Sequence, residues 1–350
     1  MFRTPLLLAL AATSLAATPA LAQTWTQTAT PPGGTVWAMA QLGSNTYAGT
    51  FSGGIYRSIN YGTSWMQVGP SGAKVRSLHL AGTVLFAGLD ANSSTAPGMI
   101  YRSTNGGTTW SNVLNNDSSL GQINAIKHGP GYFIAATHAG VLRSTTGLAG
   151  SWMASNTGLA GGPGNLPRVL SLAVSGSTVY AGTYGQGVFK SINGGVTWTS
   201  FGLSGKYIQT LLISGASVFA GGISDVGGVY KLTGSTWSVF NTGLPLNPNN
   251  NMRDVYALHQ LGTTIYAGYE LATSISKVPV NGSVWTPANA GLNTPNSARS
   301  FSSNACFMFV GTDVGVWKWV HNPMGCVKSP SGEAQLLDQT LIGNPAKEAE

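Results

Sequence analysis

The chain has 350 residues, of which 48 are glycine and only 8% are charged. This composition is typical of many short strands joined by tight turns. The formal net charge of +7 suggests a nucleic-acid surface, but one basic residue recurs at the same place in every repeat unit described below, so the charge is spread around the molecule. A nucleic-acid binder concentrates its charge on one face, and this class is therefore disfavoured.

Residues 1–22 have the pattern of a secretory signal peptide. Arg3 precedes the apolar run Leu6 to Ala12, and Ala20-Leu21-Ala22 forms a cleavage site before Gln23. The apolar run is too short to span a bilayer, and no other segment approaches that length. We expect an exported protein, secreted or at the cell surface.

Seven tryptophans recur along the chain at intervals of about 40 to 50 residues, and they are Trp25, Trp65, Trp110, Trp152, Trp198, Trp237 and Trp285. Such a period indicates a propeller or a solenoid. Within the period, short β-branched and aromatic runs alternate with glycine turns, as in 169–173, 178–183 and 187–191. This pattern predicts consecutive antiparallel hairpins, with four strands in each unit.

First strands are expected to begin near Val36, Val75, Ile123, Val169, Ile208, Val255 and Ala298. The seventh unit lacks a fourth strand with its tryptophan, whereas residues 24–27 at the other end of the chain supply one. The sequence therefore predicts an all-β fold over residues 23–320. It is a seven-bladed β-propeller of four-stranded antiparallel blades, closed by the N-terminal strand.

Three units carry the same turn motif between their third and fourth strands. Its residues are Ser58, Asn60, Gly62 and Trp65 in the first unit, Ser103, Asn105, Gly107 and Trp110 in the second, and Ser191, Asn193, Gly195 and Trp198 in the fourth. The third unit is one residue longer, from Ser144 to Trp152, and the fifth has lost the serine. An Asn side chain can bond the backbone two residues on, and glycine supplies a positive φ, so the motif is interpreted as structural.

This motif resembles the Asp box, or bacterial neuraminidase repeat, with Asn in place of the usual Asp. The resemblance implies a propeller of the sialidase-like and photosystem-assembly-factor-like superfamily, with the boxes on the face away from the ligand. Proteins with this repeat include sialidases, xyloglucan hydrolases and sortilin-type receptors. The fold does not choose among these functions.

Candidate ligand-binding residues lie where the first strands begin and where the second strands end, because both positions open on one face of a propeller. The first-strand candidates are Trp37, Arg76, Asn124, Tyr256 and Arg299, and the second-strand candidates are Asp90, His138, Tyr184, Glu270 and Asp313. We interpret the protein as an exported non-catalytic binding or assembly module, expected to be a monomer. Its ligand is a glycan or a protein.

The alternative is a polysaccharide-active glycoside hydrolase that uses Glu270 and Asp313, which lie in neighbouring units. Classical sialidase activity is not expected, because the Arg-Ile-Pro motif of that family is missing. Arg76, Arg168, Arg253 and Arg299 are also too spread around the ring to favour a convergent triad, although Arg253 and Arg299 are close enough to meet. The histidines show no metal-ligand spacing, and no cofactor is expected.

The sequence holds two cysteines, Cys306 and Cys326. In an exported chain they either form a disulfide that ties the tail to the last unit, or Cys306 is a buried thiol. Residues 321–350 form a tail whose segment 341–346 resembles the opening of a type IX secretion C-terminal sorting domain. The alternative is a disordered terminus.

Overall fold

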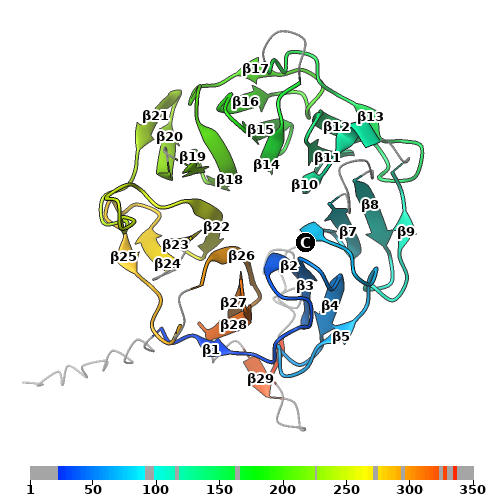
Figure 1. Cartoon of the computed structure of the whole chain (residues 1–350), viewed down its shortest axis with the longest axis vertical. Coiled ribbons are helices and arrows are strands. Elements are labelled where there is room, and N and C mark those ends of the chain that lie inside the picture. Colours follow the sequence, from blue (N-terminus) through cyan, green and yellow to red (C-terminus); the bar gives the residue numbers. More distant parts are fainter. Residues whose placement is uncertain are drawn as a thin grey trace, which may run out of the picture.

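The computed structural model describes residues 23–90, 98–114, 118–161, 166–224, 227–270, 275–292, 296–322, 326–328 and 334–336. The expected signal peptide and the segment 341–346 lie outside these ranges. In the described residues, the strands form seven four-stranded antiparallel sheets and one two-stranded sheet. The four-stranded sheets are arranged in a ring around a central channel (Figure 1). The chain is a seven-bladed β-propeller, as the sequence predicted.

Each blade is built from strands that follow one another in the chain. Blade 1 contains β2 (Val36–Leu42), β3 (Asn45–Thr50), β4 (Ile55–Ser58) and β5 (Met66–Gln67). Blade 2 contains β6 (Val75–Ala81), β7 (Val84–Leu89), β8 (Met99–Ser103) and β9 (Ser111–Asn112). Blade 3 contains β10 (Ile123–Gly129), β11 (Tyr132–Thr137), β12 (Gly140–Ser144) and β13 (Met153–Ala154), and the 3₁₀ turn η1 (Ser118–Leu120) precedes it.

The remaining blades repeat this order. Blade 4 contains β14 (Val169–Ser175), β15 (Thr178–Thr183), β16 (Val188–Ser191) and β17 (Thr199–Ser200). Blade 5 contains β18 (Tyr207–Ser214), β19 (Ser217–Ile223), β20 (Gly228–Thr233) and β21 (Thr236–Val239). Blade 6 contains β22 (Val255–Leu261), β23 (Thr264–Tyr269), β24 (Ile275–Pro279) and β25 (Thr286–Pro287), and blade 7 contains β26 (Ala298–Ser303), β27 (Phe307–Thr312) and β28 (Gly315–Val320).

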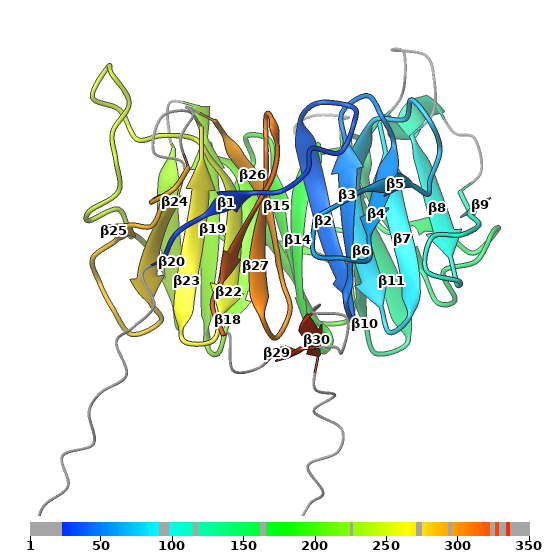
Figure 2. The ribbon, with the colours of Figure 1, turned by 90° about the horizontal axis from the view of Figure 1, so that it is seen from below.

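The N-terminal strand completes the last blade. Strand β1 (Thr26–Gln27) pairs antiparallel with β28, with Thr26 opposite Lys318 and Gln27 opposite Trp317. This pairing covers the outer edge of β28 and joins the two ends of the ring, which confirms the predicted closure. The tail adds the short hairpin of β29 (Cys326–Lys328) and β30 (Ala334–Leu336), which lies against one face of the ring (Figure 2).

The hydrophobic core lies between neighbouring blades. One buried cluster, for example, joins Ile134 of blade 3 to Val169 and Trp198 of blade 4. Close approach of the blades depends on the Ala-Gly step of the second strand. A Cβ on Gly88 would lie 2.7 Å from Cγ2 of Ile123 in the next blade, so this position admits no larger side chain without displacing a strand.

The recurring tryptophans stand at the blade corners, where they bridge blades. Six of them donate a hydrogen bond of 2.7 to 2.9 Å from Nε1 to a carbonyl oxygen near the fourth strand of the preceding blade, and these are Trp25, Trp65, Trp110, Trp198, Trp237 and Trp285. The seventh, Trp152, is buried, but its Nε1 has no hydrogen-bond partner among the described residues. Trp152 belongs to the blade whose turn motif is one residue longer.

The turn motifs are held by hydrogen bonds within themselves. In blade 1, the Ser58 hydroxyl oxygen accepts from the Gly62 amide at 2.8 Å, and Oδ1 of Asn60 accepts from the Ser64 amide at 2.9 Å. The Asn side chain thus bonds the backbone four residues on, not two as expected, because the positive φ of Gly62 folds the turn back over the side chain. Blades 2 and 4 repeat the same bonds.

Cys306 lies in the turn between β26 and β27 and is fully buried. It is disulfide-bonded, and the sequence contains one other cysteine, Cys326, in β29. A free buried thiol at Cys306 is therefore not what the structure contains. The pairing of Cys306 with Cys326, which would tie the tail to the last blade, stays a prediction.

Candidate functional site

A β-bulge stands at the start of every first strand. The register of pairing with the second strand shifts there by one residue, for example between Val75 and Ser77 in blade 2, and the same shift occurs in all seven blades. The residue inside the shift is Trp37, Arg76, Asn124, Leu170, Gln209, Tyr256 or Arg299, in chain order. Bulges re-aim a side chain, and here they direct all seven toward the axis of the ring.

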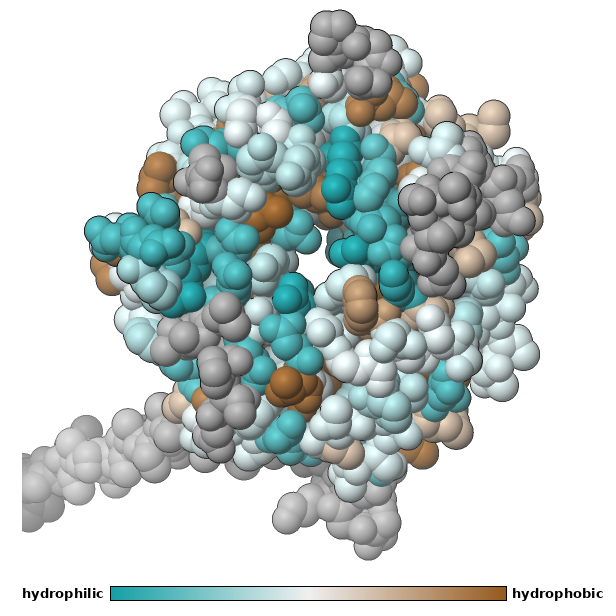
Figure 3. Space-filling view, in the orientation of Figure 1, coloured by the Kyte–Doolittle hydropathy of each residue, from teal (hydrophilic) through white to brown (hydrophobic). Residues whose placement is uncertain are grey.

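The seven bulge residues line one cavity of about 200 Å³, and Arg168 is the eighth residue around it. The cavity lies at the end of the channel where the first strands begin, which we name the first-strand mouth. Hydrophilic residues lie beside paler and hydrophobic ones around the central opening on this face of the ring (Figure 3). The mouth therefore combines guanidinium, amide and aromatic groups within the reach of one small ligand.

Five of the ten predicted rim residues line the cavity, and they are the five first-strand candidates Trp37, Arg76, Asn124, Tyr256 and Arg299. Sequence reasoning missed Leu170 and Gln209, and it considered Arg168 only for an arginine triad and not as a rim residue. Leu170 and Gln209 occupy the same place in the repeat as the five first-strand candidates. Extending that place to all seven units would have identified them. Arg168 stands one residue before its first strand, where no repeat pattern distinguishes it.

The second-strand candidates do not line the cavity. They stand behind it, and two of them hold its arginines. Asp90, which is 6% exposed, accepts hydrogen bonds from Nε and Nη2 of Arg76 at 3.2 and 2.9 Å. The same guanidinium lies 3.8 Å from the ring centre of Trp37, whose edge meets Phe51. Arg76 is therefore fixed between a carboxylate and an indole.

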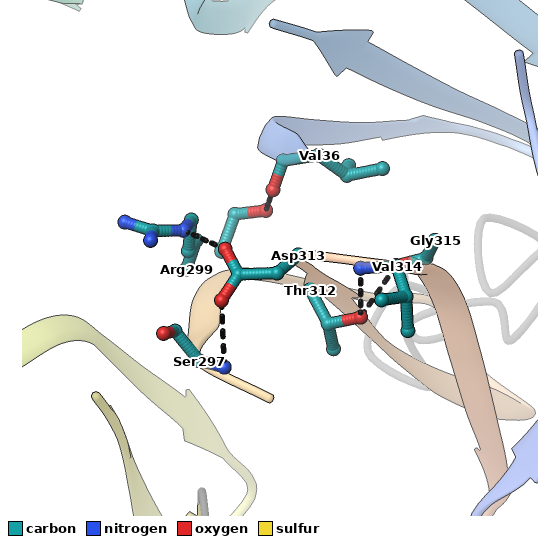
Figure 4. A network of polar contacts seen from close by, with 8 residues as sticks. Val36, Ser297, Arg299, Thr312, Asp313, Val314 and Gly315 are labelled. Carbon is teal, nitrogen blue, oxygen red and sulfur yellow. Dashed lines mark hydrogen bonds and ion pairs between the residues drawn. The ribbon is translucent and has the colours of Figure 1, made fainter. Parts of the chain in front are cut away.

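Arg299 is held in the same way on the other side of the mouth. Its Nε donates to Oδ1 of Asp313, whose Oδ2 accepts from the Ser297 amide at 3.1 Å (Figure 4). The guanidinium also lies 4.7 Å from the ring centre of Tyr256. Burial alone would raise the pKa of Asp313, but the hydrogen bonds from Arg299 and Ser297 outweigh it and hold that pKa below its ordinary value. Asp313 is thus a carboxylate at neutral pH.

Arg168 has no carboxylate partner among the described residues, where the two ion pairs are Arg76–Asp90 and Arg299–Asp313. Its Nη2 donates a long hydrogen bond of 3.3 Å to Gln122, and its guanidinium lies 5.4 Å from the ring centre of Tyr184. Its Nε is buried and has no hydrogen-bond partner in the part of the chain that the structure describes. Burial and the charge of Arg76 lower the pKa of Arg168, because both disfavour the cation.

His138 lies in the electrostatic surroundings of Arg168. Its pKa falls to about 4, first because the ring is buried and then because the Arg168 charge is near. The imidazole is therefore neutral at neutral pH. Its Nε2 is buried and makes no hydrogen bond to any described residue. Glu270, the last second-strand candidate, accepts from Nη1 of Arg253 through its backbone carbonyl oxygen at 3.1 Å.

The expectation that the arginines stay apart was wrong for three of the four. Arg76, Arg168 and Arg299 all line the one cavity, whereas Arg253 does not. Arg253, which the sequence allowed to meet Arg299, is not one of the residues that line the cavity. The reason is geometric, because residues at the axis of a ring are close to one another even when their blades are far apart in sequence.

His79 of β6 and His128 of β10 meet between neighbouring blades, beside Lys127 of β10. Nε2 of His79 lies 2.8 Å from Nδ1 of His128, and Lys127 lines the channel wall. Burial lowers the pKa of His79 well below its ordinary value, with smaller effects from Lys127 and His128. Among the described residues, no group of three or more His, Cys, Asp or Glu side chains is arranged to hold a metal ion.

Comparison with known proteins gives the fold. No protein-family model and no curated protein matches the sequence. Among solved structures, the chain is similar to the GH74 xyloglucanase from Xanthomonas campestris, with a TM-score of 0.64 and 15% identity over 89% of this chain and 55% of that one. It is also similar to YCF48 bound to D1 peptide, with a TM-score of 0.65 and 16% identity over 88% of this chain and all of that one.

A third similar structure is the extracellular domain of the putative one component system BT4673 from B. thetaiotaomicron, with a TM-score of 0.68 and 13% identity over 87% of this chain and 41% of that one. The chain spans about half the length of the GH74 enzymes that it matches. The shared property is the propeller fold. Some of these structures are glycoside hydrolases, and others are propellers that are not described as enzymes. The fold therefore does not decide between a catalytic and a binding role. None of the described residues forms a helix with the length and apolar character needed to cross a membrane.

Proposed function

We propose that the protein is an exported, non-catalytic binding module whose ligand enters the first-strand mouth. The observation that carries this proposal is the bulge ring. The seven blades share their tryptophans and their basic third-strand residue, but they differ at the bulge, where the side chains are Trp, Arg, Asn, Leu, Gln, Tyr and Arg. The fold fixes where the bulge side chain lies in each blade but does not fix which residue stands there. Such a position is suited to specific recognition of a ligand.

The similar structures support a binding role without selecting it. YCF48 is described as bound to a peptide, and the BT4673 segment is described as an extracellular domain. A protein segment or a glycan end of similar size fits the cavity of about 200 Å³, which is too small for a folded partner. Export remains a proposal that depends on the apolar pattern of residues 1–22.

The test of the binding role is a screen of the purified protein against a glycan array and a displayed peptide library, followed by mapping. Trp37→Ala and Tyr256→Ala remove aromatic groups from the cavity and should weaken the binding of any ligand that the screen identifies. Ile192→Ala is the matched control, because Ile192 is 72% exposed in the turn motif on the opposite face. If Ile192→Ala loses binding and the two mouth variants do not, the ligand binds the face opposite the first-strand mouth, which contradicts this proposal.

The alternative function is a polysaccharide-active glycoside hydrolase that uses Glu270 and Asp313, and the similarity to GH74 enzymes is the observation in its favour. Against it, Asp313 is engaged with Arg299 and kept ionised, so it is unsuited to donate a proton to a leaving group. The experiment is incubation with xyloglucan and measurement of new reducing ends. If the parent hydrolyses xyloglucan and each of Glu270→Gln and Asp313→Asn abolishes this activity, the protein is a hydrolase and the non-catalytic proposal is wrong.

A further inference from the structure

One guanidinium in the first-strand mouth is left without a counter-charge. Three arginines line the cavity, and two of them already bind a carboxylate of the protein. Arg168 is the third, and the only hydrogen bond of its guanidinium within the described residues is the 3.3 Å contact with Gln122. A cation in a partly desolvated site without an acidic partner is unfavourable, which is why such groups commonly belong to a ligand site.

Asp90 acts to raise the pKa of Arg168, but this carboxylate is already bound by Arg76, and its effect is smaller than those of burial and of the Arg76 charge. His138 is neutral because burial and Arg168 itself oppose its protonation. Tyr184 offers an aromatic ring at 5.4 Å. The eight residues that line the cavity include three arginines and no acid, and the two acids behind them balance only two of the three charges. Of the three guanidinium groups that line the cavity, that of Arg168 is therefore the one without an ion pair among the described residues.

The free part of Arg168 is accessible to the cavity. Its Nη1 has no hydrogen-bond partner in the described residues. In contrast to Nε, Nη1 is not fully buried. A planar guanidinium matches a planar carboxylate and donates two parallel hydrogen bonds to it. One unpaired charge also suits a monoanion better than a phosphate, whose double charge generally takes more than one cation.

We propose that the first-strand mouth contains a carboxylate subsite at Arg168, and that the carboxylate is an acidic side chain or the C-terminus of a peptide segment from a partner protein. This inference rests on the proposed binding function and names its ligand class. The choice of a peptide over an acidic glycan follows from the aromatic residues. Stacking on a sugar needs a free aromatic face, but guanidinium groups cover Trp37 at 3.8 Å and Tyr256 at 4.7 Å.

The remaining polar group at the mouth is suited to a peptide backbone. The Gln209 side chain lines the cavity and makes no hydrogen bond within the described residues. An amide side chain offers both a donor and an acceptor, which pairs with the N–H and C=O of an extended segment. The subsite thus combines a charge contact at Arg168 with a backbone contact at Gln209.

The experiment is selection of octapeptides with free C-termini from a random displayed library on the full-length protein. Enriched peptides are then synthesised as the acid, with Asp or Glu replaced by Asn or Gln, and with the C-terminus amidated. Removal of the recognised carboxylate should weaken binding to the parent roughly 10- to 100-fold. Arg168→Gln should weaken the binding of the acid peptide by a similar factor. The variant should then bind the acid peptide and its amide equally well.

Arg253→Gln is the matched control, because Arg253 also has a buried unpartnered Nε but lies outside the cavity. It should bind the acid form as the parent does. Enriched peptides that bind equally well as acids and amides overturn the carboxylate subsite, and if Trp37→Ala still weakens them the binding function itself stands. Failure to enrich any peptide, with binding of an oligogalacturonate that depends on Arg168, assigns the subsite to an acidic glycan and overturns the peptide ligand.

Discussion

Nη1 of Arg57 donates a hydrogen bond of 2.9 Å to the carbonyl oxygen of Gly106, in the turn motif of the next blade. Arg143 makes the same bond to Gly194 at 3.0 Å, and Lys318 to Tyr61 at 2.9 Å. In each pair the acceptor directly follows the Asn of an intact motif. The recurring basic residue thus links its own blade to the motif of the following blade.

The bond is missing where the next motif is altered. Arg102 precedes the longer turn of blade 3, and its guanidinium makes no hydrogen bond within the described residues. Lys190 and Lys231 precede units without an intact motif, and they lie over aromatic rings instead, Lys190 at 4.7 Å from Phe201. The net positive charge of the chain is therefore in large part a charge used for assembly of the ring.

Arg57→Met is expected to destabilise the protein by about 1–2 kcal/mol, because the Gly106 carbonyl loses a charged donor. Arg102→Met removes a side chain at the equivalent position that has no such bond, so it should cost clearly less. Urea unfolding of both variants beside the parent measures the difference. Equal destabilisation by the two substitutions would show that the apolar stem, not the hydrogen bond, supports the contact.

The stability of the protein should depend on the indole N–H of a blade-corner tryptophan that donates a hydrogen bond, but not on that of Trp152. Trp110→Phe removes the donor to Val68, a bond of 2.8 Å, and should cost about 1 kcal/mol beyond the change in packing. Trp152→Phe removes a buried N–H that has no partner, so this polar contribution should vanish or become favourable. Thermal unfolding of the two variants compares them directly. A larger loss for Trp152→Phe would mean that an unseen partner, such as water, satisfies its Nε1.

The free energy of unfolding should fall as the pH decreases below neutrality. Burial lowers the pKa of His259 from its ordinary 6.5 to about 4, with smaller effects of Lys127 and His321. Because the folded pKa lies below the unfolded one, the unfolded state binds more protons between these values and gains stability as the pH falls through them. His259 alone accounts for up to about 3 kcal/mol, and His79 acts in the same direction.

Denaturant unfolding between about pH 4 and pH 8 measures this dependence. His259→Gln should flatten the curve between about pH 4 and pH 6.5 and leave its slope above pH 7 unchanged. An unchanged curve in the variant would show that His259 does not carry the acid sensitivity.

Asp313→Asn should destabilise the protein at neutral pH by about 1–2 kcal/mol, because Arg299 loses its charged acceptor. The folded pKa of Asp313 lies below its ordinary value of 3.8, so its contribution is present above that pH and disappears as the pH falls through the folded pKa. The difference between parent and variant should therefore shrink in acid. A difference in melting temperature that stays constant from about pH 6 to about pH 3 would contradict this assignment.

The ring and its closure were predictable because their signals are local. A strand, its turn and its tryptophan lie within one repeat, and the shortage of one strand at the C-terminal end matched the surplus at residues 24–27. The pairing of β1 with the last blade needed only that count, whereas the register that places Thr26 opposite Lys318 came from the structure. By contrast, the hydrogen bond from Arg57 to Gly106 depends on how far neighbouring blades are rotated against each other, which no repeat pattern states.

The candidate site was predictable only in its first-strand residues. Trp37, Arg76 and Tyr256 share a position in the repeat, and the sequence by itself determined that this position opens on one face. Only the tertiary structure decided that Arg76, Arg168 and Arg299 meet, because convergence depends on the narrow axis around which the seven bulges are arranged. It also decided which charges are already balanced, since pairing with Asp90 or Asp313 is a matter of distances across strands, and so left Arg168 as the charge without a partner.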